Sequence, residues 1–230
     1  MLAFQLIKGR SLDYPVSLEV EQGEVLASIA GALKARSGSL TLNGETFLPK
    51  SPSQAIKKKI AYCSSDRKKD GLFLGRPIFE NLTSPALTAI SQYGFNFGST
   101  EQDHSKNLAK EFLIDVKRMF DEAGLLSGGN QQKVALGKWL SIQPDVLLVN
   151  EPTRGVDVGA KSEIYQRMRD LAARGITIIF ASTDIQEITY LPDRVITFYR
   201  GMMIDEHRLE NIQTPTILKE ITDPFNETNL

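Results

Sequence analysis

The chain has 230 residues, enough for one large domain or for a core with a smaller lobe. Hydrophobic residues make up 41% of it and charged residues 24%, which is ordinary for a soluble globular protein. The formal net charge is −1, so no basic surplus points to nucleic acid, and we expect no nucleic-acid partner. The single cysteine, Cys63, cannot form an internal disulfide, which favours a reducing compartment, and we expect it to be a small buried residue.

No run reaches the roughly 18 apolar residues that a membrane-spanning helix needs. The first residues, MLAFQLIKGRSL, turn polar too soon for a secretory signal. We therefore expect neither feature. His104 and His207 each stand in polar surroundings, and we expect both at the surface.

The N-terminal part is predicted to be rich in strands. Apolar and polar residues alternate over 16–20, which predicts a half-buried strand. Residues 25–29, VLASI, predict a second strand, and residues 40–44, LTLNG, predict a strand followed by a tight turn. Another short strand is expected at residues 60–63.

Residues 76–143 have the pattern of an inserted helical lobe. Residues 93–99 form a glycine-rich aromatic loop, and residues 103–119 predict a helix. Its apolar side chains recur at helical spacing and are Leu108, Phe112, Val116 and Met119. We expect Phe112 and Met119 to be part of the core.

The most informative stretch is residues 126–157, LSGGNQQKVALGKWLSIQPDVLLVNEPTRGVD. A Ser-Gly-Gly turn leads into a helix with one apolar face, which Pro144 ends. Residues 146–149 are continuously apolar, which is typical of a parallel strand buried on both faces. This strand ends in Asn150 and Glu151.

Both parts of this stretch favour phosphate chemistry. Two glycines at a helix start allow backbone N–H groups to approach an anion, and Ser127 can donate a further hydrogen bond. Polar side chains at the end of a buried strand stand where open α/β sheets bind ligands. Taken alone, the turn could be only a helix cap and Glu151 only a solvated carboxylate.

The remaining third continues the strand–helix alternation. A helix at 161–174, ended by Gly175, and a strand at 176–181 complete a right-handed parallel unit with strand 146–149. Residues 182–184, STD, are expected to cap the next helix. Residues 194–206 then predict a closing hairpin.

Three segments of residues 126–157, taken in chain order, resemble motifs of ABC-type ATPases. LSGGNQQK is similar to the signature, VLLVNEP to the Walker B motif, and TRGVD to the D-loop. SSDRKKDG, residues 64–71, resembles the Q-loop segment of sugar-importer cassettes, with Ser65 where that group carries Glu. The whole resembles the second cassette of bacterial pentose and hexose importers, whose relatives move autoinducer-2 or nucleosides.

The resemblance implies an α/β fold: a P-loop NTPase-like ABC ATPase core with an inserted helical subdomain. Three parts are expected: residues 1–75, the β-rich and Q-loop part; 76–143, the helical subdomain ending in the signature helix; and 144–230, with Walker B, D-loop and switch region. It also implies ATP and Mg²⁺ shared with a second cassette, membrane permease subunits and, indirectly, a periplasmic sugar-binding protein. The expected location is peripheral, at the cytoplasmic face of the inner membrane.

The resemblance also implies roles for single residues. The signature residues, which bind ATP across a dimer of cassettes, are Leu126, Ser127, Gly128, Gly129, Asn130 and Gln131. The other matching positions are Glu151 as the base that orients water, Asn150 in Walker B, Asp157 in the D-loop, Ser65 and Asp66 in the Q-loop region, and Thr183 at the switch position. Asn150 replaces an Asp, so it is at best a weak Mg²⁺ ligand, and Thr183 stands where most of the family has His.

One motif of the family is missing from its expected place. A phosphate loop, G-x-x-x-x-G-K-[ST], should follow residues 25–29 and open a helix, but residues 31–38 read GALKARSG. Too few residues separate the expected strand from the next one for a loop and a crossover helix. Lys34 is the nearby candidate for the phosphate lysine. Residues 155–162, GVDVGAKS, nearly fit the pattern but lie in the D-loop, with Ala160 for the second glycine.

Three functions remain open at this point. The chain could be the ATP-binding part of a sugar ABC importer whose own site is degenerate and which donates its signature to a partner cassette. It could be a stand-alone active ATPase. It could also be a non-functional truncated cassette, in which the lost crossover helix leaves apolar core surface uncovered.

Overall fold

The computed structural model describes residues 2–5, 12–13, 22–35, 40–42, 44–87 and 98–225. The expected strand at 16–20 and most of the loop at 93–99 lie outside these residues. The chain forms two compact units, the first from Met1–Tyr62, Asp145–Glu151 and Arg169–Leu230, the second from Cys63–Pro144 and Pro152–Met168. The division into residues 1–75, 76–143 and 144–230 stays a prediction.

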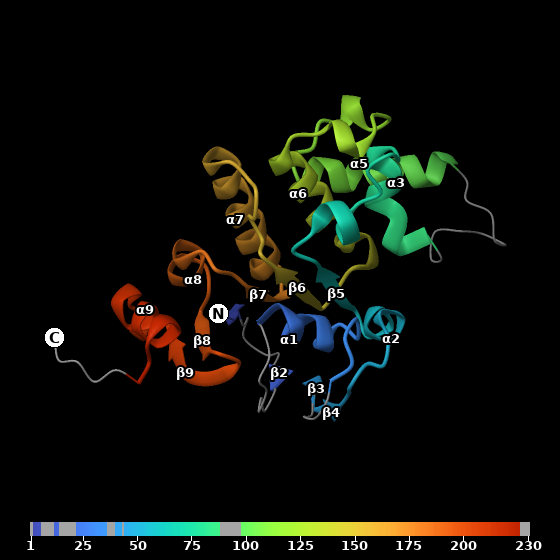
Figure 1. Ribbon diagram of the computed structural model, residues 1–230. Helices are drawn as coiled ribbons and strands as arrows, with labels where there is room; N and C mark the ends of the chain where they lie inside the picture. The colour runs from blue at the N-terminus through green and yellow to red at the C-terminus, as the bar shows by residue number, and fades with distance from the viewer. Residues whose placement is uncertain are drawn as a thin grey trace. The chain divides into compact units, whose positions relative to one another are not determined.

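A six-stranded sheet in the order β5-β6-β7-β1-β8-β9 is the base of the first unit (Figure 1). Its strands are β1 (Leu2–Gln5), β5 (Ile60–Cys63), β6 (Val146–Asn150), β7 (Thr177–Ala181), β8 (Arg194–Tyr199) and β9 (Met202–Arg208). β6 and β7 pair in parallel, with Val146 opposite Thr177, as predicted. β1 pairs antiparallel with both β7 and β8, and β8 with β9 forms the predicted hairpin.

The centre of this sheet is buried as the apolar runs predicted. All five residues of β7 and the first four of β6 are buried. Leu148 and Ile179 are fully buried in the main apolar core. Strands covered on both faces need no alternation, which is why both read as continuous apolar runs.

The predicted strand at residues 25–29 is wrong, because this segment lies in a helix, α1 (Gln22–Ile29). Val25, Leu26 and Ile29 are each at most 1% exposed and join the core that contains residues of β6 and β7. Spacings of one and four residues place these side chains on one side of a helix. A five-residue apolar run fits a strand or a helix, and here packing on the sheet decides between them.

Shorter elements complete the first unit. They are β2 (Leu12–Asp13), β3 (Thr41–Leu42), β4 (Glu45–Thr46), α2 (Pro52–Lys57), α8 (Ile185–Tyr190) and α9 (Thr214–Thr222), with a 3-10 turn at Leu209–Asn211. β3 and β4 pair antiparallel through the predicted tight turn, where Gly44 has φ +82°. Asp184 caps α8 by accepting the N–H of Gln186, as expected.

His207 is not the surface residue that its sequence context predicted. It lies on β9 at 9% exposure, and its Nε2 is 2.9 Å from Oε2 of Glu220 on α9. The hydroxyl of Thr197, on β8, donates to the same Glu220 oxygen over 2.7 Å. The three side chains form a polar cluster that joins α9 to the β8–β9 hairpin, and pairing of this kind is what makes burial of polar groups tolerable.

The second unit is mainly helical. Its helices are α3 (Ile78–Thr83), α5 (Gly98–Glu111), α6 (Gly128–Gly137) and the first part of α7 (Val158–Ala173), with a π-helical segment at Arg67–Gly71 and 3-10 turns at Ser84–Ala86, Val116–Arg118, Ala123–Leu125 and Lys138–Ile142. The helix predicted for 103–119 ends at Glu111, because Leu113 adopts the left-handed conformation, φ +53°. His104, on α5, is half-buried rather than at the surface.

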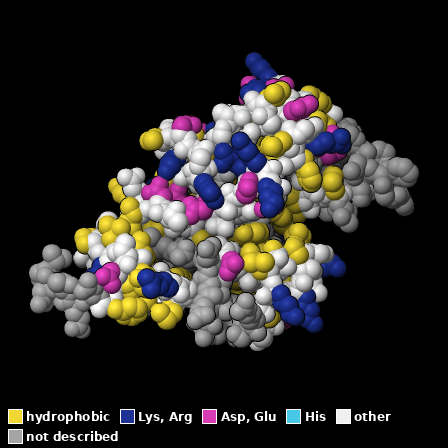
Figure 2. Space-filling model, in the orientation of Figure 1, with side chains coloured by type: hydrophobic (Ala, Val, Ile, Leu, Met, Phe, Trp, Pro, Cys, Tyr) yellow, Lys and Arg dark blue, Asp and Glu magenta, His cyan; other side chains and the backbone are white. Residues whose placement is uncertain are grey.

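In the described part of the chain, no helix combines the length and apolar character that crossing a membrane requires. The face drawn in Figure 2 carries Lys and Arg side chains interspersed with Asp and Glu side chains, in keeping with the net charge of −1.

Candidate functional site

In the first unit, the end of β6 carries the polar pair that the sequence singled out. The N–H of Glu151 donates to the carbonyl of Ala181 over 2.8 Å, which extends the β6–β7 pairing by one residue. Glu151 itself has φ +55°. A left-handed conformation costs a residue with a side chain roughly 1–2 kcal/mol, and such strain is concentrated at functional sites.

The carboxylate of Glu151 is held by the segment that follows β7. Its Oε1 accepts the backbone N–H of Thr183 over 2.9 Å. The next N–H, that of Asp184, donates to the hydroxyl of Ser182, so this turn is ordered by side-chain acceptors. The predicted base and the predicted switch residue therefore lie side by side at the carboxyl end of two parallel strands.

Asn150 lies against the first turn of α1. A Cβ on Gly23 would come within 2.4 Å of the Nδ2 atom of Asn150, so the absence of a side chain at Gly23 makes room for the amide. Lys34 is exposed and follows the opposite end of α1, a helix about 12 Å long at 1.5 Å per residue. The helix thus separates Lys34 from the polar end of β6.

In the second unit, the predicted signature forms the start of α6. Ser127 is the N-cap, and its Oγ accepts the N–H of Asn130 over 3.4 Å. Ser127 is exposed, whereas Leu126 and Gln131 are buried. As an acceptor in this cap, the hydroxyl of Ser127 keeps its own hydrogen for a further partner.

The two signature glycines are packed against the segment predicted as the D-loop. A Cβ on Gly128 would lie 2.7 Å from the carbonyl oxygen of Gly155, and one on Gly129 would lie 2.6 Å from Cβ of Ala160. Both distances are too short for real side chains. From the sequence, the two glycines were expected only to let backbone N–H groups approach an anion. The structure shows that they also allow the start of α6 to pack closely against Gly155 and Ala160 inside the second unit.

Arg67 joins the same group and was not singled out from the sequence. Its Nη1 donates to the carbonyl of Arg154 over 2.5 Å, its Nη2 to the carbonyl of Gly155 over 3.1 Å, and its Nε to Oε1 of Gln131 over 3.4 Å. Burial lowers the pKa of Arg67, partly offset by the charge of Asp66. Within the charged run SSDRKKDG, no spacing or neighbouring residue distinguishes Arg67 from the two lysines that follow it.

The other predicted residues near this group act as caps. Asp66 accepts the N–H groups of Lys68 and Lys69 over 3.2 and 3.1 Å, which starts the π-helical segment. Ser65 precedes it and is half-buried. Asp157 accepts the N–H of Ala160 over 3.0 Å at the start of α7.

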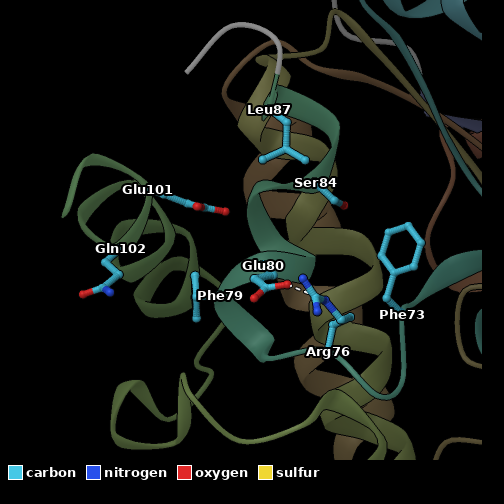
Figure 3. Close-up of a pocket in the computed structure, with 8 residues that line it drawn as sticks. All are labelled: Phe73, Arg76, Phe79, Glu80, Ser84, Leu87, Glu101 and Gln102. Atoms are coloured by element: carbon cyan, nitrogen blue, oxygen red, sulfur yellow. Dashed lines mark ion pairs between the residues drawn. The ribbon is translucent and has the colours of Figure 1, made fainter. Parts of the chain in front are cut away.

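A pocket of about 520 Å³ also lies in the second unit (Figure 3). It is lined by Phe73, Arg76, Phe79, Glu80, Ser84, Leu87, Glu101 and Gln102. Arg76 and Glu80 form an ion pair of 2.7 Å between Nε and Oε2, and buried Glu101 accepts the hydroxyl of Thr83 over 2.6 Å. None of the site residues predicted from the sequence lines this pocket.

The comparisons with known proteins agree with the motifs. Residues 18–154 match the family described as ABC transporter. The chain belongs to the ABC transporter family. The ribose import ATP-binding protein RbsA of Streptococcus agalactiae serotype III is 40% identical over 205 residues, and that of Roseobacter denitrificans is 33% identical over 218 residues. These matches cover 89% and 95% of this chain but 42% and 43% of the relatives, so it spans less than half of their length.

Solved ABC cassettes share the fold. The ATP-binding cassette MJ0796 in a post-hydrolysis state with ADP and Pi superimposes with a TM-score of 0.70 at 18% identity, over 92% of this chain and all of that one. A nucleotide-free cassette gives a TM-score of 0.68 at 18% identity, over 90% and 91%. The predicted fold, a P-loop NTPase-like ABC ATPase core, is confirmed.

In this ABC transporter chain, the predicted site residues that the structure describes form two groups. The predicted Walker B and switch positions meet in the first unit, through the bond between Glu151 and Thr183. The predicted signature and D-loop positions meet in the second, around Gly128 and Gly155. The resemblance predicted the members of each group, whereas only the structure gives the contacts that join them.

Proposed function

We propose that the chain is the ATP-binding part of a sugar ABC importer, which couples ATP binding and hydrolysis to transport. We further propose that its own nucleotide site is degenerate and that it donates its signature half-site to a partner cassette. The observation that carries the proposal is the asymmetry between the two groups of residues. The signature and D-loop positions carry residues that match the family's motifs, whereas the described residues of the first unit include no phosphate loop that would bind a triphosphate.

The region around Asn150 supports the view of a degenerate site. A phosphate loop binds triphosphate through a nest of backbone N–H groups and a lysine. Here α1 starts directly beside Asn150, and Lys34 follows the far end of that helix. Asn150 offers one neutral oxygen where Mg²⁺ favours carboxylates.

The signature region supports the role of donor. Ser127 is exposed at the start of a ten-residue helix, with its cap formed and its hydroxyl hydrogen still available. Backbone N–H groups and the dipole at a helix N-terminus attract phosphate. Such a turn needs no phosphate loop in the same chain if the partner supplies ATP.

The core argues against a truncated remnant that folds poorly. That hypothesis predicts apolar sheet surface left uncovered where the crossover helix is missing. Instead, α1 contacts β6 and β7, and its apolar side chains are buried with Leu148 and Ile179. The helix α1 therefore covers apolar surface of β6 and β7.

The proposal includes specific partners. ATP and Mg²⁺ would be shared with a second cassette that supplies the phosphate loop, the metal ligands and the base. Membrane permease subunits, served by a periplasmic sugar-binding protein, would place the chain at the cytoplasmic face of the inner membrane. The ribose import function in the names of the relatives supports a sugar as cargo.

The test is the ATPase activity of this chain reconstituted with a competent partner cassette. We expect Ser127→Arg to lower the stimulated rate by about 10²–10³, because preorganised donors to developing charge contribute that much. Glu151→Gln and Asn150→Ala, in the chain's own site, should leave most of the rate and act as matched controls. If Glu151→Gln silences the pair while Ser127→Arg does not, the chain's own site works and the donor proposal is wrong.

A further inference from the structure

We propose that Arg67 is a positioning residue that holds the signature helix and the D-loop together as one unit, so that Ser127 is presented in a fixed geometry. The inference deepens the proposed donor function and rests on it for its effect on catalysis. The contact network itself stands on the second unit alone.

The guanidinium of Arg67 bonds to both segments at once. Two of its nitrogens donate to the consecutive carbonyls of Arg154 and Gly155, at 2.5 and 3.1 Å, and Nε donates to Gln131 on α6 at 3.4 Å. Gln131 is buried, and its amide group donates to the carbonyl of Ala123 over 3.4 Å. Arg67 therefore ties the D-loop backbone to a side chain that is itself fixed within the unit.

These contacts need arginine rather than lysine. The guanidinium is planar and presents five N–H donors in a fixed fork, whereas an ammonium is a single point on a flexible stem. The carbonyl oxygens of Arg154 and Gly155 accept from Nη1 and Nη2, and Oε1 of Gln131 accepts from Nε. A lysine at position 67 could reach one of these oxygens but could not hold all three.

There is no room for a side chain at Gly128 in this arrangement. A Cβ there would lie 3.0 Å from Nη2 of Arg67 as well as 2.7 Å from the Gly155 oxygen. The first residue of the signature helix, the D-loop carbonyl and the guanidinium are thus in mutual contact.

The segment that carries Arg67 is bonded along the signature helix. Arg67 begins the π-helical segment, and Gly71 ends it. The carbonyl of Gly71 accepts Nζ of buried Lys138, just beyond the C-terminal end of α6, over 2.5 Å. The segment is therefore attached near both ends of α6, which fixes the side from which Arg67 reaches the D-loop.

The first experiment measures hydrogen exchange in the chain alone, for the wild type, Arg67→Ala, Arg67→Lys and the adjacent exposed control Lys68→Ala. We expect Arg67→Ala to speed exchange at least tenfold at residues 127–131 and 152–160, because the loss of even one hydrogen bond of a charged group raises the population of locally open states by roughly tenfold. Arg67→Lys should recover only part of the protection, and Lys68→Ala should match the wild type.

Two outcomes of this experiment would overturn the proposal. Exchange in Arg67→Ala that stays at the wild-type level in both segments would show that no such restraint exists. Exchange that rises equally in α3 and α5 would show a general loss of stability rather than positioning.

The second experiment uses the reconstituted pair of cassettes. Arg67→Ala should lower kcat about tenfold or more with little change in the KM for MgATP, since it disturbs donors to the transition state rather than ground-state binding. A rise in KM alone would overturn the positioning role. If Ser127→Arg also has no effect, the donor function fails, while the exchange result still decides whether Arg67 joins the two segments.

Discussion

The backbone N–H of Thr183 donates to Oε1 of Glu151 over 2.9 Å, which links the residue after β6 to the turn after β7. Glu151 reaches this position with a left-handed backbone, φ +55°. The carboxylate that resembles the water-orienting base of the family is thus held by its own chain at the switch position. Side chain and backbone at Glu151 can be tested separately, because three substitutions change them in different ways.

We predict that Glu151→Gln and Glu151→Gly have similar free energies of unfolding and that Glu151→Ala is about 1 kcal/mol less stable than either. Gln keeps an acceptor for the Thr183 N–H, whereas Ala loses it at a cost of about 1 kcal/mol. Gly loses the same bond but regains about 1 kcal/mol, because it adopts positive φ without strain. Urea denaturation measures the differences, and an Ala variant as stable as the Gly variant would contradict the left-handed backbone.

The contact between Gly129 and Ala160 predicts a compensating pair of substitutions. A Cβ on Gly129 would lie 2.6 Å from Cβ of Ala160. We expect Gly129→Ala to destabilise the chain by about 1–3 kcal/mol through overpacking. Ala160→Gly removes the opposing Cβ at a cost of about 1 kcal/mol in helix propensity.

The double variant should therefore be more stable than Gly129→Ala alone, which requires a coupling energy in a double-mutant cycle larger than the cost of about 1 kcal/mol for Ala160→Gly. Gly159→Ala is a suitable control, since its added Cβ would meet only a carboxylate oxygen of Asp157, at 3.4 Å. Additive effects of the two substitutions would mean that the signature helix and α7 are not packed as described.

The sequence predicted the elements whose signal is local and strong. The parallel pair β6–β7 followed from two continuous apolar runs, and the start of α6 followed from Ser127 and the two glycines. What it missed depends on contacts between distant residues. The five apolar residues at 25–29 fit either a strand or a helix until the sheet they cover is known. Arg67 is set apart from Lys68 and Lys69 only by the carbonyls that it reaches.

The packing of α1 gives a direct test that residues 25–29 form a helix and not the predicted strand. Leu26 is fully buried in the core, whereas Leu33, just beyond the helix, is 44% exposed. Leu26→Ala should cost about 2–5 kcal/mol through lost burial and the cavity left behind. Leu33→Ala is the matched control and should change the unfolding free energy by less than about 1 kcal/mol. Equal effects at the two positions would show that α1 does not cover the sheet.

The isolated chain should bind nucleotide poorly. Without the phosphate loop's nest of N–H groups, we predict no measurable MgATP hydrolysis and a Kd no tighter than roughly 1 mM, about −4 kcal/mol. Calorimetry measures the affinity, and phosphate release measures turnover. Turnover by the pure chain that disappears in Glu151→Gln would contradict this prediction and favour a stand-alone ATPase.

The buried thiol of Cys63 predicts how stability depends on alkaline pH. Cys63 is 2% exposed, and its Sγ lies 3.8 Å from the carbonyl oxygen of Ala135. Burial raises the pKa of this thiol to about 11 from 9.0, although the charges of Lys138 and Arg67 act in the opposite direction. In the folded chain the thiol therefore keeps its proton over a pH range in which the unfolded chain has lost it.

A raised folded pKa contributes stability that is complete below the unfolded pKa and is lost as pH rises towards the folded one. From pH 9 to 11 the wild type should therefore lose up to about 3 kcal/mol that the Cys63→Ala variant does not lose, at 1.36 kcal/mol per pKa unit. The other titrating groups are present in both proteins, so the difference between their unfolding free energies reports the thiol together with its coupling to Lys138 and Arg67. Urea denaturation at intervals across this range measures it. Parallel pH curves for the two proteins would show that the thiol ionises as readily in the folded chain as in the unfolded one.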